Sequence, residues 1–188
     1  MGPVARRWNQ RPRLPLGRRS TQKKHAADVL EPSDHHLGRS RGGWGSKLHL
    51  VTDGNGIVLA VTLTAGQAHE SKQLCPLMHA VRPPRHIGWP LKLGGDKGYS
   101  YDGIRDHLTV CGIEAVIPRK DNQPPRPGEV FDKATYRKRA RVEQAVGWLK
   151  ECRRIGTRYE KLGLNFLGFA KLGVIQRYLR ILHPSDRA

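Results

Sequence analysis

The chain has 188 residues, of which 34 are lysine or arginine and 16 are aspartate or glutamate, so its formal net charge is +18. This length is enough for one domain with its own core plus an appendage. A positive charge of this size predicts a polyanionic partner, nucleic acid before an anionic membrane. A membrane span is not expected, because lysine and arginine interrupt residues 164–182, the most apolar stretch.

Two further classes of protein are disfavoured by the composition. Residues 1–24 lack the apolar block of a signal peptide, so we expect a soluble, cytoplasmic protein. The three cysteines are far apart and odd in number, which predicts neither a disulfide framework nor a zinc site. His35 and His36 are adjacent, but no second ligand pair at metal spacing accompanies them, so a structural metal is not predicted there.

The N-terminal segment is strongly basic. Residues 1–24 contain eight lysines and arginines, three prolines and no acid, a composition that predicts a flexible arm. Residues 25–45 continue as a polar loop that ends in a basic, glycine-rich run. We therefore divide the chain into a basic arm and loop, residues 1–36, and a folded domain, residues 37–183.

The folded domain alternates strands and helices. Two β-prone runs flank Asp53-Gly54-Asn55-Gly56, whose Asp-Gly and Asn-Gly steps predict a β-hairpin. The predicted elements, in order, are strands at 47–51 and 57–63, a helix at 70–81 in which Pro76 is a candidate kink, a link at 82–90, a strand at 91–95, a helix at 101–110, a strand at 114–118, a loop at 119–130, and helices at 132–154 and 164–182. An antiparallel hairpin followed by alternating helices and strands predicts a mixed α/β sheet flanked by helices.

The helix predicted at 132–154 carries an unusual charge pattern. Tyr136, Arg139, Glu143 and Lys150 follow at helical spacings, within a wedge of roughly 60°. Glu143 is thus one carboxylate among cations, on a helix whose adjoining apolar stripe anchors it to a core. The simpler interpretation is a surface helix with ion pairs worth a few tenths of a kcal/mol each.

A second acid, Asp96, follows the strand predicted at 91–95. Functional groups of open α/β sheets gather beyond the carboxyl ends of strands, although aspartate is also a common turn residue. If Asp96 and Glu143 border the same sheet edge, their carboxylates suit Mg²⁺ or Mn²⁺ beside a phosphodiester held by lysine and arginine. That chemistry is typical of nucleases and strand-transfer enzymes.

Several separated motifs together resemble one family, the DDE transposases of bacterial insertion sequences of the IS-four and IS-five type. The spacing of Tyr136, Arg139, Glu143 and Lys150 matches that family's signature around its catalytic glutamate, and Asp96-Lys97-Gly98-Tyr99 is similar to the segment around its second catalytic aspartate. Residues 37–43, 66–70 and 153–159 are also similar to family segments. The resemblance covers about residues 30–182 and implies an RNase H-like fold, Mg²⁺ or Mn²⁺ as cofactor, and DNA as partner.

The resemblance also implies a gap at the front of the fold. The family has three antiparallel strands first and carries its first catalytic aspartate on the first of them, whereas our predicted order lacks that strand. Asp28 and Asp34 lie in a polar loop, and the turn explains Asp53, so none of them replaces the missing acid. We therefore expect a truncated transposase that retains Asp96 and Glu143.

The resemblance and the charges assign roles to the other motif residues. Lys150 and Arg139 are expected to face the DNA backbone, Tyr136 either orders substrate or packs the helix start, and Lys97 adjoins Asp96. Arg153 and Arg154 are equally consistent with a solvated helix end or a phosphate-binding patch.

Three functions remain open at this point. The first is metal-dependent cleavage and strand transfer at terminal inverted repeats, by a homo-oligomer on DNA. The second is an inactive fragment that binds DNA or inhibits the full-length enzyme. The third, a basic RNA-binding protein, needs no pair of acids.

Overall fold

The computed structural model describes residues 4–10, 33–40, 43–81 and 90–184, the first of these segments by its backbone. The strands are β1 (Val4–Gln10), β2 (Gly38–Ser40), β3 (Gly43–Thr52), β4 (Val58–Ala65), β5 (Lys92–Gly95) and β6 (Glu114–Val116). The α-helices are α1 (Leu74–Ala80), α2 (Asp102–Val110), α3 (Lys133–Arg137), α4 (Ala140–Glu151), α5 (Arg153–Gly156) and α6 (Gly163–Leu182). Short 3₁₀ turns occur at η1 (Ser33–His35), η2 (Glu70–Gln73) and η3 (Lys97–Tyr99).

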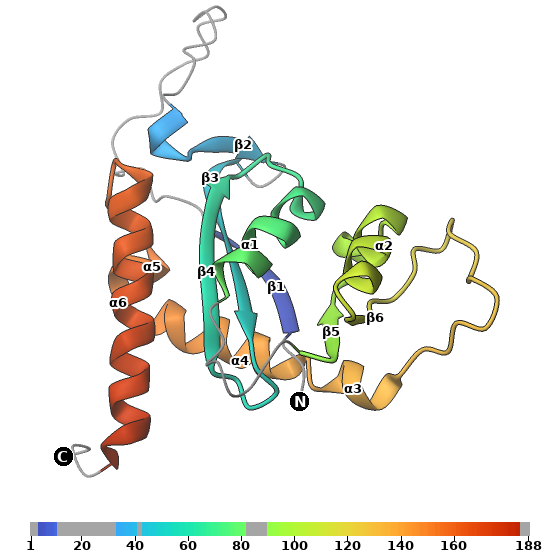
Figure 1. Ribbon diagram of the computed structural model, residues 1–188. Coiled ribbons are helices and arrows are strands. Elements are labelled where there is room, and N and C mark those ends of the chain that lie inside the picture. The colour runs from blue at the N-terminus through green and yellow to red at the C-terminus, as the bar shows by residue number, and fades with distance from the viewer. Residues whose placement is uncertain (1–3, 11–32, 41–42, 82–89, 185–188) are drawn as a thin grey trace, which may run out of the picture.

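A mixed sheet forms the centre of the molecule (Figure 1). β3 pairs antiparallel with β4 on one side and with β1 on the other, and β2 pairs with the first residues of β3. β1 then pairs in parallel with β5, which pairs in parallel with β6. β1 thus joins the antiparallel hairpin to the parallel half of the sheet.

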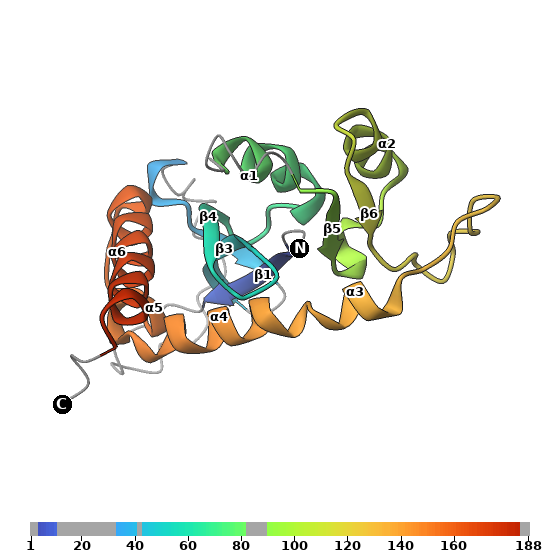
Figure 2. The same cartoon turned by 60° about the horizontal axis from the view of Figure 1, so that its bottom comes forward.

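Helices cover both faces of the sheet (Figure 2). Leu48 and Leu50 of β3 pack with apolar residues of α4, α5 and α6, whereas Val51 packs with residues of α1 and α2. This division follows from the alternation of side chains along a strand. The α/β class predicted from the sequence is confirmed.

The strand β1 corrects two predictions, the flexible arm at residues 1–24 and the missing first strand. Val4–Gln10 pairs with residues 46–52 of β3 along its whole length and with Gly94 and Gly95 of β5. The segment lacks a clear strand pattern, but both neighbouring strands need partners for their backbone N–H and C=O groups. Residues 11–24 of the predicted arm lie outside the described residues, and the domain boundary before residue 37 stays a prediction.

Several elements differ from prediction in their limits. The predicted polar loop at 25–45 includes β2 and the start of β3. The helix predicted at 132–154 consists of α3, α4 and α5, and the chain is extended at Cys152 (φ −67°, ψ 107°), between α4 and α5. This break turns Ile155 into the core beside Leu149 and Phe166. The hairpin, the helix after it and the last helix are confirmed within a few residues. No helix in the described ranges is both long enough and apolar enough to cross a bilayer.

The pairing of β1 can be tested with proline. Ala5 is paired with Val51 of β3 on one side and with Gly95 of β5 on the other. Its N–H therefore faces a paired strand, whichever side of β1 it is on. We expect Ala5→Pro to lower the free energy of unfolding by about 2 kcal/mol or more, because proline removes a ladder donor. Ala5→Gly keeps the donor and should cost about 1 kcal/mol or less. Urea denaturation measures both, and equal effects of the two substitutions would contradict a paired strand.

Candidate functional site

Asp96 lies directly after β5, at the carboxyl end of that strand. It caps the η3 turn, where its Oδ1 accepts a hydrogen bond of 2.8 Å from the backbone N–H of Gly98. The side chain is partly buried. The local reason for an aspartate here is therefore the turn, and its position at the strand end is also the one expected of a functional acid.

Glu143 lies in the first turn of α4 and is exposed. Its Oε1 is 3.0 Å from the guanidinium of Arg139, which in turn lies 5.3 Å from the ring centroid of Tyr136. The structure therefore brings these three predicted residues together although α3 and α4 are separate helices. An exposed pair of this kind contributes about 0.5 kcal/mol to stability.

Asp96 follows β5, the parallel neighbour of β1, and Glu143 is on α4, which packs against β1. Ala5 pairs with Gly95, so position 6 of β1 is level with Asp96, the residue after Gly95. Position 6 is also paired with Leu50 of β3, whose side chain packs in a cluster with apolar residues of α4. Two residues that are directly paired across an antiparallel ladder lie on the same face of the sheet. Position 6 therefore belongs to the face covered by the helix that carries Glu143. This position is an arginine, and Val4–Gln10 contains no acid.

These residues do not fit the expected Mg²⁺ or Mn²⁺ site. Among the residues that the structure describes, no three histidine, cysteine, aspartate or glutamate side chains are grouped so that they could hold a metal ion. Asp96 is one available carboxylate, Glu143 is paired with Arg139, and the sequence of Val4–Gln10 contains no acid. Hard divalent cations need several oxygen ligands held together, so the ligand set is incomplete.

The remaining predicted DNA-binding residues lie on the surface in two groups. Lys97 is 2.9 Å from Asp121, and it is close to Asp96 in the chain. Lys150 and Arg153 are exposed near the end of α4 and the start of α5. Arg154 is 3.1 Å from Glu160 and lies over the ring of Phe169 at 4.7 Å. Arg154 therefore has a structural partner, whereas Arg153 is exposed to solvent.

Arg158 is a structural residue whose role the sequence did not reveal. It is only 5% exposed, and its guanidinium donates to the carbonyls of His35, Glu160 and Lys161 at 2.5 to 2.9 Å and to the hydroxyl of Ser46. These bonds join η1, the start of β3 and the segment before α6. The five arginines and lysines from position 150 to position 161 look alike in the sequence, and only burial distinguishes this one.

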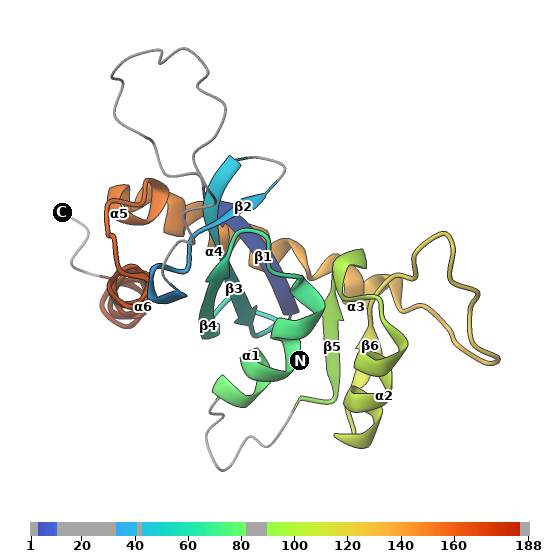
Figure 3. The same cartoon turned by 90° about the horizontal axis from the view of Figure 1, so that it is seen from above.

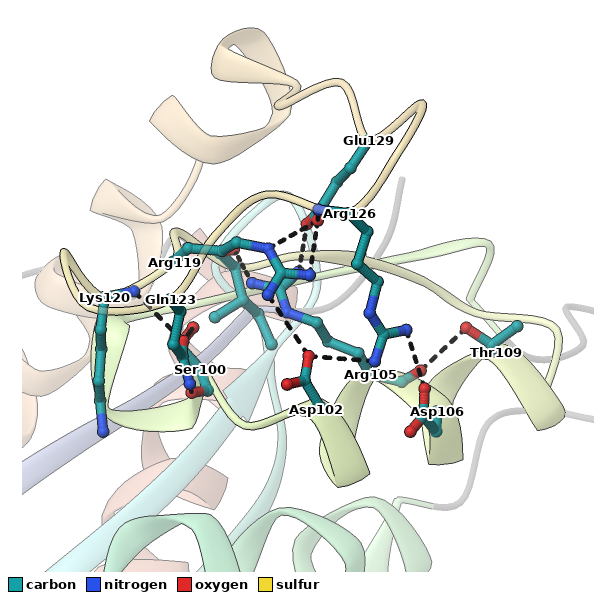
Figure 4. A network of polar contacts seen from close by, with 11 residues as sticks. Ser100, Asp102, Arg105, Asp106, Thr109, Arg119, Lys120, Gln123, Arg126 and Glu129 are labelled. Carbon is teal, nitrogen blue, oxygen red and sulfur yellow. Dashed lines mark hydrogen bonds and ion pairs between the residues drawn. The ribbon is translucent and has the colours of Figure 1, made fainter.

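A second network missed by the sequence holds the loop of residues 117–131 against α2 (Figure 4). Arg105 donates to Glu129 at 2.8 Å and to the carbonyl of Ile117 at 2.5 Å, and Arg119 also donates to Glu129 at 2.7 Å. Arg126 reaches Asp102 at 3.0 Å and Asp106 at 2.8 Å. Burial raises the pKa of Glu129, but the N–H of Arg126 and the two guanidinium groups outweigh it and hold that pKa below its ordinary value. The loop is thus fastened at both ends, although it projects from the body of the molecule (Figure 3).

Comparison with known proteins relates this chain to transposases. Residues 20–172 match the family model described as the transposase DDE domain. The chain is 34% identical over 149 residues to a putative transposase for insertion sequence element IS402 of Burkholderia cepacia, an alignment that covers 77% of this chain and 67% of that protein. It is 27% identical over 135 residues to a putative transposase for insertion sequence element IS6501 of Brucella ovis, covering 72% and 98%. No solved structure matches the chain significantly.

The structural role of Arg158 predicts a large loss of stability on truncation. Arg158→Ala leaves several buried carbonyls without a donor, so we expect the free energy of unfolding to fall by about 3 kcal/mol. Arg153→Ala, an equal change at an exposed position, should cost less than about 0.5 kcal/mol. Chemical denaturation monitored by tryptophan fluorescence gives both values. If both variants lose a similarly small amount of free energy of unfolding, Arg158 does not have this structural role and is available to contact DNA.

Proposed function

Because the chain belongs to the transposase DDE domain family, we propose that it acts in DNA transposition, as a domain that binds DNA at insertion-sequence ends and carries two acids of a DDE site, Asp96 and Glu143. Its fold in this proposal is RNase H-like. The observed order supports that assignment: three antiparallel strands, β1, β3 and β4, come first, and then helix, strand, helix, strand and helix.

Cleavage is the part of the function that the geometry supports least. DDE transposases typically use a divalent metal, and the residues here do not complete its ligand set. The observation that carries the proposal is that, among the described residues, neither Asp96 nor Glu143 belongs to a group of three side chains that could hold a metal ion. We therefore propose that this chain binds DNA without completing phosphodiester cleavage on its own, the second of the functions open from the sequence.

Full cleavage and strand transfer is the second candidate. It is supported by the elements that carry the two acids: Asp96 follows β5, which pairs with β1, and Glu143 is on α4, which packs against β1. In that case a further acid ligand comes from outside the described residues or from another molecule. A homo-oligomer on DNA, also expected from the resemblance, would offer such a source.

DNA binding is expected to be largely electrostatic, given a net charge of +18. The binding constant for a labelled DNA duplex should fall steeply with salt, with a slope of about −0.9 per phosphate contacted. We expect Lys150→Gln to reduce the size of that slope by about 0.9, whereas Lys171→Gln, an equal change on α6, should leave it unchanged. Fluorescence anisotropy over a salt series measures these slopes. A wild-type protein that does not bind DNA would refute the proposed function.

The incomplete acid set predicts a gain of function. Arg6→Asp introduces an acid at the β1 position that follows the Ala5–Gly95 pair, as Asp96 does after β5. We expect Mg²⁺- or Mn²⁺-dependent nicking of supercoiled DNA to appear in this variant at about ten times the wild-type level or more. Arg7→Asp makes the same charge change at a position on the opposite face and should stay inactive.

A second substitution identifies the source of any nicking. Adding Glu143→Gln or Asp96→Asn to Arg6→Asp should abolish it. If the wild-type protein nicks DNA and Glu143→Gln stops the reaction, the second candidate is correct and our proposal of an incomplete site is wrong.

A further inference from the structure

Three side chains from separate segments meet near the carboxyl end of β5. His69 comes from the segment before η2, Tyr101 precedes α2, and Lys120 lies in the loop after β6. The Tyr101 hydroxyl is 2.9 Å from His69 Nε2 and 3.1 Å from Lys120 Nζ. The His69 and Tyr101 rings are in edge contact at 5.3 Å, and the Lys120 ammonium lies 4.2 Å from the centroid of the Tyr101 ring.

The hydrogen bonds leave donor protons without an acceptor among the described residues. His69 Nδ1 lies 3.4 Å from the backbone nitrogen of Ser71 and 2.7 Å from the Ser71 hydroxyl, so we assign Nδ1 as an acceptor and the ring proton to Nε2. Nε2 then donates to the Tyr101 hydroxyl, which also accepts from Lys120. The hydroxyl proton of Tyr101 has no acceptor among the described residues, and Lys120 has protons left over.

Lys120 differs from most cations around it because it has no carboxylate partner within the described ranges. Neighbouring cations already form ion pairs with acids. Lys97 pairs with Asp121, and the three arginines of Figure 4 pair with Asp102, Asp106 and Glu129. Its contacts are with the hydroxyl and the face of Tyr101. A cation held over an aromatic ring keeps its charge available to an outside anion.

The loop network also positions Lys120. Gln123 donates to the carbonyl of Ser100 at 2.8 Å, and its Oε1 accepts from the Ser100 hydroxyl at 2.7 Å and from the N–H of Lys120 at 3.3 Å. The backbone that carries Lys120 is therefore tied to the residue that precedes Tyr101. Both donors are preorganised by the fold, so little entropy is lost when a ligand binds.

This cluster adjoins Asp96. His69 precedes Glu70, a buried residue whose Oε1 is 3.6 Å from Lys47. A side chain on Gly98 would collide with Glu70 Oε2 and come within 2.9 Å of Asp96 Oδ1. The η2 and η3 turns are therefore packed together, with His69 at the start of one and Asp96 at the start of the other.

We propose that His69, Tyr101 and Lys120 form a binding site for one phosphate of the DNA backbone, beside the Asp96 end of the sheet. Lys120 provides the charge, Tyr101 donates its hydroxyl proton, and His69 orients that hydroxyl. A phosphodiester fits because it offers negatively charged oxygens to two converging donors. The inference rests on the proposed DNA binding and extends it to a strand that runs past Asp96.

The test is DNA binding by the full chain, measured by fluorescence anisotropy over a series of chloride concentrations. Lys120→Gln should reduce the size of the salt slope by about 0.9, because one phosphate contact is lost. Tyr101→Phe removes only the hydroxyl, so we expect the affinity to fall about five-fold with the slope nearly unchanged. Lys171→Gln, on α6, is the matched charge control and should alter neither quantity. Thermal denaturation of each variant identifies any loss of folding.

Failure of the site and failure of the function give different results. If the wild-type protein binds DNA with a steep salt dependence and Lys120→Gln has the same slope, the phosphate site is wrong while DNA binding stands. A slope that falls equally in Lys171→Gln also overturns the site, because the effect is then one of net charge. If the wild-type protein does not bind DNA, the proposed function itself fails.

Discussion

The pairing of β1 with two different strands is the constraint on which the rest of the structure depends. β3 and β5 would otherwise each leave a row of N–H and C=O groups without partners in the middle of the molecule, where helices exclude water from both faces. A single strand satisfies both rows because it is antiparallel to one neighbour and parallel to the other. The hairpin with its α6 layer and the parallel half with α2 therefore become one body.

The same strand lies beside the elements that carry the two candidate acids. Asp96 follows β5, which pairs in parallel with β1, and Glu143 is on α4, which packs against β1. Val4–Gln10 has two arginines and no acid. The strand therefore adds no carboxylate to those two as a ligand for a metal ion.

The shortage of acids also shapes the surface. Sixteen acids face 34 lysines and arginines, and many acids in the described part of the chain hold a cation that fixes a loop or a turn. Asp132 is an example: it accepts from Thr135 and pairs with Lys92, and these contacts hold its pKa well below the ordinary value. Cations without such partners, Lys120 among them, stay available to an outside polyanion.

The sequence by itself determined the elements with strong local signals. The Asp-Gly and Asn-Gly steps identify the hairpin, and the apolar stripe of Val142, Val146 and Leu149 identifies α4. Motif spacing predicts Asp96 and Glu143 as site residues, which stays a prediction. Only the tertiary structure decided the roles of Val4–Gln10 and Arg158. A strand without its own pattern forms because its neighbours need hydrogen bonds, and one arginine among several becomes buried because distant carbonyls converge on it. The formation of β1 and the burial of Arg158 both depend on contacts between groups far apart in the chain. Local propensity and motif spacing do not predict such contacts.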